Sequence, residues 1–246
     1  AEQKLARYFP ADADGATPIA YIWARTIISE APAQGDVPVE IPLLRSMWLA
    51  KGGGANRAFR WAGDGRGAIK AEIVEVDYQD GRKLKVRRPV LEIFAPKRAD
   101  EVEHGTSGGG AATCPLTGFT MSVESVRRQL NTRRGGAADA RLVCVVTTSS
   151  TTVGRSYRLP RPHDIQEASA AAAELMRLAE KHNQDISPVP NENLNHLRGF
   201  FNVVLYGMST WGDLFSPRQL LVMLTLVDII RKFDDPAIPI DLKTAV

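Results

Sequence analysis

The middle of the chain alternates between apolar and polar residues with the period of a β-strand. Between residues 69 and 76 apolar residues stand at every second position, first on one parity and then on the other. The dipeptide Asp80-Gly81 then separates two such runs, and Asp-Gly is typical of tight hairpin turns. We therefore expect a β-hairpin here, with a further strand over residues 90–94.

Two other segments have different patterns. Residues 142–148 are an uninterrupted run of β-branched and apolar residues, which predicts a buried strand with Cys144 as a core residue. Residues 104–112 are rich in Gly and Ser and predict a mobile loop.

Helical spacing occurs in the first part of the chain. Residues 2–9 have apolar positions at helical intervals and end at Pro10. Residues 17–25 predict a second short helix, opened by Thr17-Pro18. Residues 123–130 predict an amphipathic helix.

The two strongest helix signals lie near the C-terminus. For residues 164–183 we expect Asp164 to cap the helix and Glu167 to complete a capping box. Residues 216–233 begin with Ser-Pro, a cap followed by a proline at the first helical position. This helix is apolar nearly all round, so we expect it to be buried in a core or an interface.

These elements predict a mixed α+β fold. A strand-rich region over residues 1–160 is followed by a helical region over residues 161–246, packed on the first as one unit. Composition agrees, because 246 residues with 44% apolar content can form one soluble domain. Two Cys residues exclude a disulfide framework, no run approaches the roughly 20 apolar residues of a membrane span, and no signal peptide is evident. We expect a cytoplasmic protein without a membrane partner.

The basic residues are unevenly distributed. The formal charge is only +3, yet residues 45–88 contain eleven cations against five acids. A basic stretch of this kind attracts a phosphate backbone. The alternative is a solvated hairpin surface without a ligand.

A set of segments spread over nearly the whole chain has a recognisable sequence. These are residues 7–12, 18–26, 24–35, 41–49, 112–118, 126–130, 141–143, 157–160 and 206–219. They resemble, in the same order, segments of one family of adenine-specific DNA methyltransferases, the family that carries a zinc-ribbon insertion. The resemblance implies that the chain is the middle of a larger enzyme that uses S-adenosylmethionine, or a protein derived from that middle.

The resemblance places four residues at the zinc-ligand positions of the ribbon. The family's knuckles read Cys-x4-Cys-Gly and Cys-Pro-x-Cys-Gly, whereas this chain has Ser29, Gln34, Cys114 and Thr117. One thiolate cannot supply the ~10–16 kcal/mol of a structural zinc site. We therefore predict a degenerate zinc ribbon without metal, held together by apolar packing across the same hairpins.

The chemistry of methyl transfer is absent from the sequence. Gly63 to Gly67 has no apolar strand before it, and Asp235-Pro236-Ala237 lacks the second proline and the aromatic residue of the family's catalytic loop. The glycines are better explained by turn chemistry. We expect no catalytic residue and no cofactor site in this chain, and we expect it to be inactive alone.

Two hypotheses remain. In the first, the chain engages double-stranded DNA and positions the target while residues elsewhere in the parent enzyme transfer the methyl group. In the second, it is a structural or interaction domain whose helix over residues 216–233 docks on the rest of the methyltransferase or on a partner subunit. The candidate phosphate contacts are Arg57, Arg60, Arg82, Lys83, Lys85, Arg87, Arg88, Arg127, Arg128, Arg133 and Arg134.

Two aromatic residues could add base contacts. Tyr206 and Trp211 lie beside glycines in one of the resembling segments. They could stack on a base, or they could belong to a local core.

Overall fold

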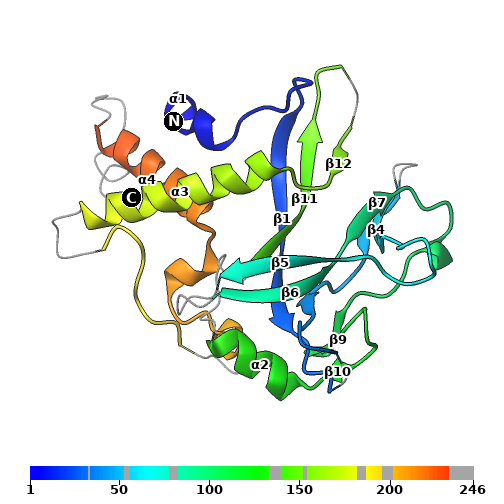
Figure 1. Cartoon of the computed structure of the whole chain (residues 1–246). Helices are drawn as coiled ribbons and strands as arrows, with labels where there is room; N and C mark the ends of the chain where they lie inside the picture. The colour runs from blue at the N-terminus through cyan, green and yellow to red at the C-terminus, as the bar shows by residue number, and fades with distance from the viewer. Residues whose placement is uncertain are drawn as a thin grey trace.

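The structure is a computed structural model that describes residues 1–32, 34–52, 56–77, 83–132, 140–151, 154–181, 187–195 and 202–232. Helices and strands both occur, which confirms the predicted α+β class. Every described strand lies between residues 17 and 158, and the two longest described helices follow them (Figure 1).

The strand β1 (Thr17–Ile28) runs through the centre of the molecule (Figure 1). It belongs to an antiparallel sheet of order β12-β11-β1-β2, in which it pairs with β11 (Ala140–Thr148) and then with β2 (Glu40–Pro42). The helix predicted over residues 17–25 is therefore wrong. The segment is rich in β-branched and aromatic residues, which suit a pleated surface, and pairing with a distant strand overrides the local helical spacing.

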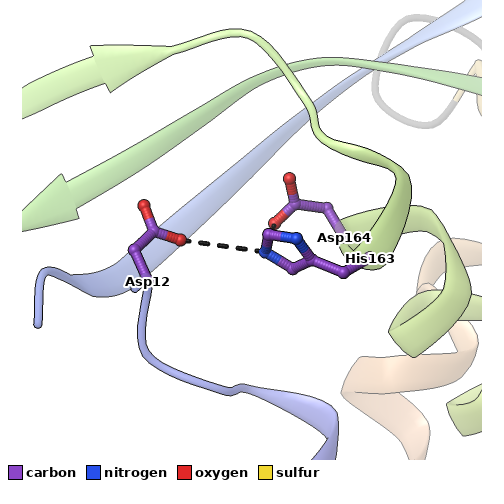
Figure 2. Close-up of side chains that lie close together, drawn as sticks. All are labelled: Asp12, His163 and Asp164. Carbon is purple, nitrogen blue, oxygen red and sulfur yellow. Dashed lines mark ion pairs between the residues drawn. The ribbon is translucent and has the colours of Figure 1, made fainter. Parts of the chain in front are cut away.

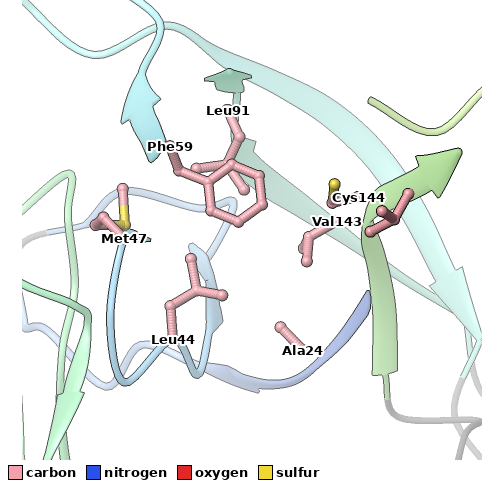
Figure 3. Close-up of a cluster of buried hydrophobic side chains, with 8 residues drawn as sticks. Ala24, Leu44, Met47, Phe59, Leu91, Val143 and Cys144 are labelled. Carbon is pink, nitrogen blue, oxygen red and sulfur yellow. The ribbon is translucent and has the colours of Figure 1, made fainter. Parts of the chain in front are cut away.

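A second sheet packs against this one. It has the order β3-β4-β7, formed by β3 (Trp48–Ala50), β4 (Arg57–Trp61) and β7 (Leu91–Phe94). Phe59 and Leu91 from this sheet meet Cys144 and its neighbours from β11 in one buried cluster (Figure 3). Cys144 is fully buried, as predicted for a core residue, and burial raises the pKa of its thiol to about 11.

The predicted hairpin is a separate two-stranded ribbon. The strands β5 (Ala71–Asp77) and β6 (Lys83–Pro89) pair antiparallel along their whole length. The turn residues Asp80 and Gly81 lie outside the described residues. A short 3₁₀ helix, η2 (Ala99–Glu101), follows the next strand.

The Gly-rich segment is more regular than its composition indicates. It contributes β8 (Ser107–Gly108) and β9 (Ala111–Thr113), which form a small sheet with β10 (Thr120–Met121). The expected loop over residues 104–112 is therefore wrong in its second half. The chain passes so close to its neighbours there that a Cβ on Gly105 would lie 2.2 Å from the carbonyl oxygen of Leu44.

The helical layer combines residues from both ends of the described chain. The helix α3 (Pro162–Glu180) packs on α4 (Pro217–Lys232), with α1 (Glu2–Leu5) and η1 (Ala6–Tyr8) beside them (Figure 1). Leu5, Tyr8, Ala171 and Leu221 form its buried cluster. No helix in the described part of the chain is both long and apolar enough to cross a bilayer. The remaining elements are α2 (Val123–Thr132), β12 (Ser156–Arg158), η4 (Val203–Tyr206) and η5 (Trp211–Leu214).

The two long helices begin in different ways. In α4 the prediction is confirmed: Ser216 precedes Pro217, and its Oγ accepts a hydrogen bond from the backbone of Gln219 at 3.3 Å. In α3 the prediction is wrong, because the helix begins at Pro162. Asp164 is its third residue, and the Asp164 carboxylate accepts a hydrogen bond from the backbone N–H of Arg161 at 2.7 Å.

Candidate nucleic-acid interface

Eight of the eleven candidate phosphate contacts lie in the described residues; Arg82, Arg133 and Arg134 lie outside them. The eight come from three elements. Lys83, Lys85, Arg87 and Arg88 are on β6, Arg57 and Arg60 are on β4, and Arg127 and Arg128 are on α2.

The two lysines of β6 lie on the outer face of the β5–β6 ribbon. Lys83 and Lys85 are exposed, whereas Leu84 and Val86, which alternate with them along the strand, turn inward. The Lys83 ammonium lies 3.1 Å from the Glu75 carboxylate, and Glu75 is the strand partner of Lys85. The outer face therefore has both signs of charge, with its cations accessible.

The two arginines of β6 are used inside the molecule. Arg87 donates hydrogen bonds to the backbone carbonyls of Gln34 and Val37, the latter at 3.0 Å. Arg88 donates two hydrogen bonds to the buried carboxylate of Glu40, at 2.6 and 3.0 Å. Both guanidinium groups hold the ribbon on the loop before β2 and on β2 itself.

Of the two arginines of β4, one is half-buried and the other is exposed. Arg57 is half-buried and donates to the backbone carbonyl of Asn56 at 2.7 Å. Arg60 is exposed, pairs with Glu92 at 2.9 Å and lies over the ring of Phe94.

On α2, Arg127 and Arg128 point to different surroundings. The Arg127 guanidinium lies over the ring of Tyr206, 5.6 Å from its centroid, and its Nε is buried. Arg128 is exposed and donates to the Glu30 carboxylate at 2.7 Å. Burial opposes ionisation of Glu30, but hydrogen bonds from Ser125, Gln129 and Arg128 outweigh it and lower the pKa of Glu30.

The structure thus divides the eight cations into two groups. Exposed ion pairs contribute about 0–1 kcal/mol to stability, so an exposed cation can exchange its carboxylate for a phosphate. Arg87 and Arg88 bond to backbone carbonyls and to a buried acid, so they cannot do so without disturbing the fold. Arg57 and Arg127 are half-buried too, against the Asn56 carbonyl and the Tyr206 ring. The exposed group is Arg60, Lys83, Lys85 and Arg128, and the half-buried group is Arg57, Arg87, Arg88 and Arg127.

The two candidate stacking residues also differ. Tyr206 packs against the cluster beneath α2, and its backbone carbonyl accepts a hydrogen bond from Arg25 at 2.6 Å. Trp211 is 48% exposed at the start of η5. Of the two, the Trp211 ring is therefore the one more open to a ligand.

The four positions that correspond to zinc ligands are held by other interactions. The Gln34 side chain donates to the carbonyl of Ser29 at 2.6 Å and accepts from the N–H of Val39 at 3.2 Å, so its amide closes the first loop. Cys114 is fully buried in an apolar cluster with Val39 and residues of α2, while Thr117 is exposed. The Oγ of Ser29 and the Oγ1 of Thr117 also accept hydrogen bonds from backbone N–H groups, those of Ala31 and Phe119. One thiol and three neutral side chains, all three engaged by backbone, do not fit a tetrahedral zinc site.

The glycine segment is a local turn. The Asp64 carboxylate accepts hydrogen bonds from the backbone N–H groups of Arg66 and Ala68, at 2.7 and 3.0 Å. The next regular element is the strand β5, so no helix N-terminus follows that could hold a cofactor phosphate or carboxylate. The predicted turn chemistry is therefore confirmed, but the expectation that no strand precedes these glycines is wrong, because β4 ends at Trp61.

Sequence reasoning missed a buried polar cluster at the junction of sheet and helices. Asp12, His163 and Asp164 lie together there, with Asp12 on the segment before β1 and the others in the first turn of α3 (Figure 2). Arg158 of β12 donates to both carboxylates, to Asp12 at 2.7 and 2.7 Å and to Asp164 at 2.6 and 2.9 Å. Arg158, His163 and Asp164 are close in sequence, but Asp12 is 146 residues from Arg158, so no local signal joins it to the others.

This donor set does not fit a metal ion. Although Asp12, His163 and Asp164 present their ligand atoms within 4.8 Å of one another, the Arg158 guanidinium already occupies both carboxylates. Arg161 adds a second cation 3.3 Å from Asp12. Burial opposes ionisation of Asp164, but the hydrogen bonds from Arg158 and from the Arg161 backbone outweigh it and lower the pKa of Asp164. The cluster is a structural ion network.

Arg218 of α4 extends this network to the helical layer. Its guanidinium is buried between the rings of Phe9 and Tyr21, at 5.0 and 4.3 Å from their centroids. It also donates to the backbone carbonyl of Asp164 at 3.3 Å. Stacking on two rings stabilises a cation that has no carboxylate directly against it among the described hydrogen bonds and ion pairs.

No protein-family model, curated protein or solved structure matches the chain.

Proposed function

We propose that the chain is a non-catalytic, DNA-engaging segment of an adenine-specific DNA methyltransferase. The resembling segments support the family, and the loops around Ser29 and Cys114 would be its degenerate zinc ribbon. S-adenosylmethionine and the groups that transfer the methyl would belong to other parts of the parent enzyme. The role proposed for this chain is to hold duplex DNA in place.

The observation that carries this proposal is the two-faced character of the β5–β6 ribbon. One face has apolar residues that are buried or half-buried, while the other presents the exposed Lys83 and Lys85 together with the exposed Ile73. A two-stranded ribbon fits the major groove of B-DNA, and lysines on its outer face can reach phosphates. Arg60 and Arg128 are further accessible cations, and Trp211 is an accessible ring.

An acid of β5 limits the affinity. The Glu75 carboxylate lies 3.1 Å from the Lys83 ammonium, and Glu75 is the strand partner of Lys85. This carboxylate must separate from Lys83 before a phosphate takes its place. We therefore propose weak binding that needs the rest of the enzyme for sequence recognition.

The test is the fluorescence anisotropy of a labelled DNA duplex titrated with the whole chain, at about 0.05–0.2 M salt. Replacing Lys83 and Lys85 together by Ala should weaken binding and reduce the slope of log K against log salt by about 1.8, the value for two phosphate contacts. The matched control replaces Lys97 and Lys181, two exposed lysines outside the ribbon, and should leave the slope unchanged. Affinity that does not depend on salt, or equal slopes for both double variants, would refute the proposal.

A second candidate function is a protein-interaction domain. One observation favours it: in α4 the buried residues are Arg218, Leu220 and Leu221, whereas Met223 and Leu226 are 37% and 42% exposed. An exposed apolar helix face is a common mark of a protein contact. Absence of DNA binding together with stable association with the remainder of the parent methyltransferase would favour this function over the first.

A further inference from the structure

A groove lies within the helical layer, away from the β5–β6 ribbon. It has a volume of about 770 Å³, and its described lining comes from α1, η1, α3, α4 and residues 187–188. Its apolar part includes Leu178, Leu224 and Val227, which are all half-buried. The groove therefore has uncovered apolar surface between helices.

The rim of the groove is basic. Four cations and two carboxylates are among the described residues that line it. Asp228 is shared by two ammonium groups, Lys4 at 3.4 Å and Lys232 at 2.5 Å. The other carboxylate, Glu174, is paired with Arg177 at 2.5 Å. Each acid is already compensated, and the trio of Lys4, Lys232 and Asp228 carries a net positive charge.

The two lysines are accessible. The side chains of Lys4 and Lys232 are 60% and 72% exposed, while Asp228 is 42% exposed. Hydrogen bonds from Lys232, the largest cause, and from Lys4 lower the pKa of Asp228, so the acid stays ionised at neutral pH. A ligand that brings its own carboxylates would gain contacts with both lysines.

We propose that this groove binds an acidic amphipathic helix of a protein partner. Leucine-like residues of the partner, spaced as on one helix face, lie on Leu224 and Val227, and carboxylates beside them contact Lys4 and Lys232. Helices, together with residues 187–188, line the groove, and no strand edge is among the described lining, which favours a helix over an added strand. This binding is independent of DNA contact and gives a specific partner chemistry to the second candidate function, through Leu224 and Val227 of α4 and not through the exposed Met223 and Leu226.

The probe is a synthetic peptide of about 18 residues, long enough for five helical turns. It has Leu at positions i, i+3, i+4 and i+7, Glu on both flanks of that stripe, and a fluorescent label. One control peptide has Lys in place of Glu, and another has the Leu residues redistributed so that no stripe forms. Binding to the whole chain is followed by anisotropy at low and high salt.

Two protein variants locate the binding. Replacing Lys4 and Lys232 together by Ala should weaken binding of the Glu peptide about fivefold and remove its preference over the Lys peptide. Leu224→Ser should weaken both peptides. Met176→Ser is the matched control, because Met176 is 64% exposed on α3 and is not among the described residues of the groove. Circular dichroism verifies that each variant is folded. If Leu224→Ser does not fold, the double variant of Lys4 and Lys232 tests the proposal instead.

Three results would overturn the proposal. The first is equal binding of the Glu, Lys and redistributed peptides. The second is a dimer of the chain alone that Leu224→Ser dissociates, which would assign the groove to a second copy. The third is binding that appears only after Asp234, Asp235 and Asp241 are replaced by Asn, which would assign the groove to the chain's own C-terminal sequence. The Lys83 and Lys85 variant should bind the peptide normally, so a failed DNA test and a failed peptide test remain distinguishable.

Discussion

Arg88 of β6 and Glu40 of β2 form a two-bonded ion pair in which the Glu40 side chain is only 4% exposed. The pair fastens the β5–β6 ribbon to the central sheet. Removing the guanidinium would leave a buried carboxylate without its partner, whereas an exposed pair loses little when broken.

Arg88→Ala should therefore lower the free energy of unfolding by about 2–3 kcal/mol, below the full cost of a broken buried pair because Arg88 is partly exposed. Arg60→Ala breaks the exposed pair with Glu92 and should cost less than about 1 kcal/mol. Urea denaturation of both variants measures the contrast. Equal losses would mean that burial of Glu40 does not set the strength of the pair.

A second prediction concerns the pH dependence of stability. The pKa of Asp164 is lowered in the folded protein, so its contribution is complete above the ordinary aspartate pKa of about 3.9. It is lost as the pH falls below that value and through the folded-state pKa. The Asp164→Asn variant should thus have a lower free energy of unfolding than the unsubstituted chain at neutral pH, and the difference should shrink in acid. Thermal melts across this range measure it, and a constant difference would contradict the assigned cause.

A third prediction uses two glycines in one segment. A Cβ on Gly105 would lie 2.2 Å from the Leu44 oxygen and 2.4 Å from the Arg45 carbonyl carbon, whereas a Cβ on Gly108 meets nothing within 4 Å. Gly105→Ala should cost about 3 kcal/mol or more, because backbone must move, and Gly108→Ala should stay within about 0.5 kcal/mol. Chemical denaturation compares them. A mild effect at Gly105 would show that residues 44 and 45 can move apart easily.

A fourth prediction tests the four positions that correspond to zinc ligands. The unsubstituted chain should bind no stoichiometric zinc, because Ser29, Gln34 and Thr117 are poor ligands beside Cys114. Replacing those three residues by Cys should create a site for one zinc per chain if the positions converge as the resemblance implies. Metal analysis after dialysis measures both proteins. Zinc in the unsubstituted chain, or none in the triple variant, would contradict the degenerate-ribbon interpretation.

Local patterns predicted the elements whose causes are local. The β5–β6 ribbon follows from alternation on both sides of Asp80-Gly81, and the start of α4 follows from Ser216-Pro217. β1 could not be predicted in this way, because its partner β11 lies far along the chain and pairing with it decides between strand and helix.

The candidate site was predicted less well, since charge alone does not separate exposed cations from internal ones. One signal was present in the sequence: Arg88 shares its parity with Leu84 and Val86, the inward positions of β6, whereas Lys83 and Lys85 have the opposite parity. Arg87 has the outward parity and is nonetheless bound to the loop carbonyls of Gln34 and Val37. Only the tertiary arrangement could have identified that contact.

The ion network of Arg158 and the buried cluster of Leu5 with Leu221 have a practical consequence for dissecting the molecule. A cut near residue 160 would leave Asp12 and Leu5 on one fragment and Asp164 and Leu221 on the other. The C-terminal fragment would then expose surfaces that the first residues normally cover. The two fragments should regain their structure when both are produced in the same cell, as in a genetic complementation experiment.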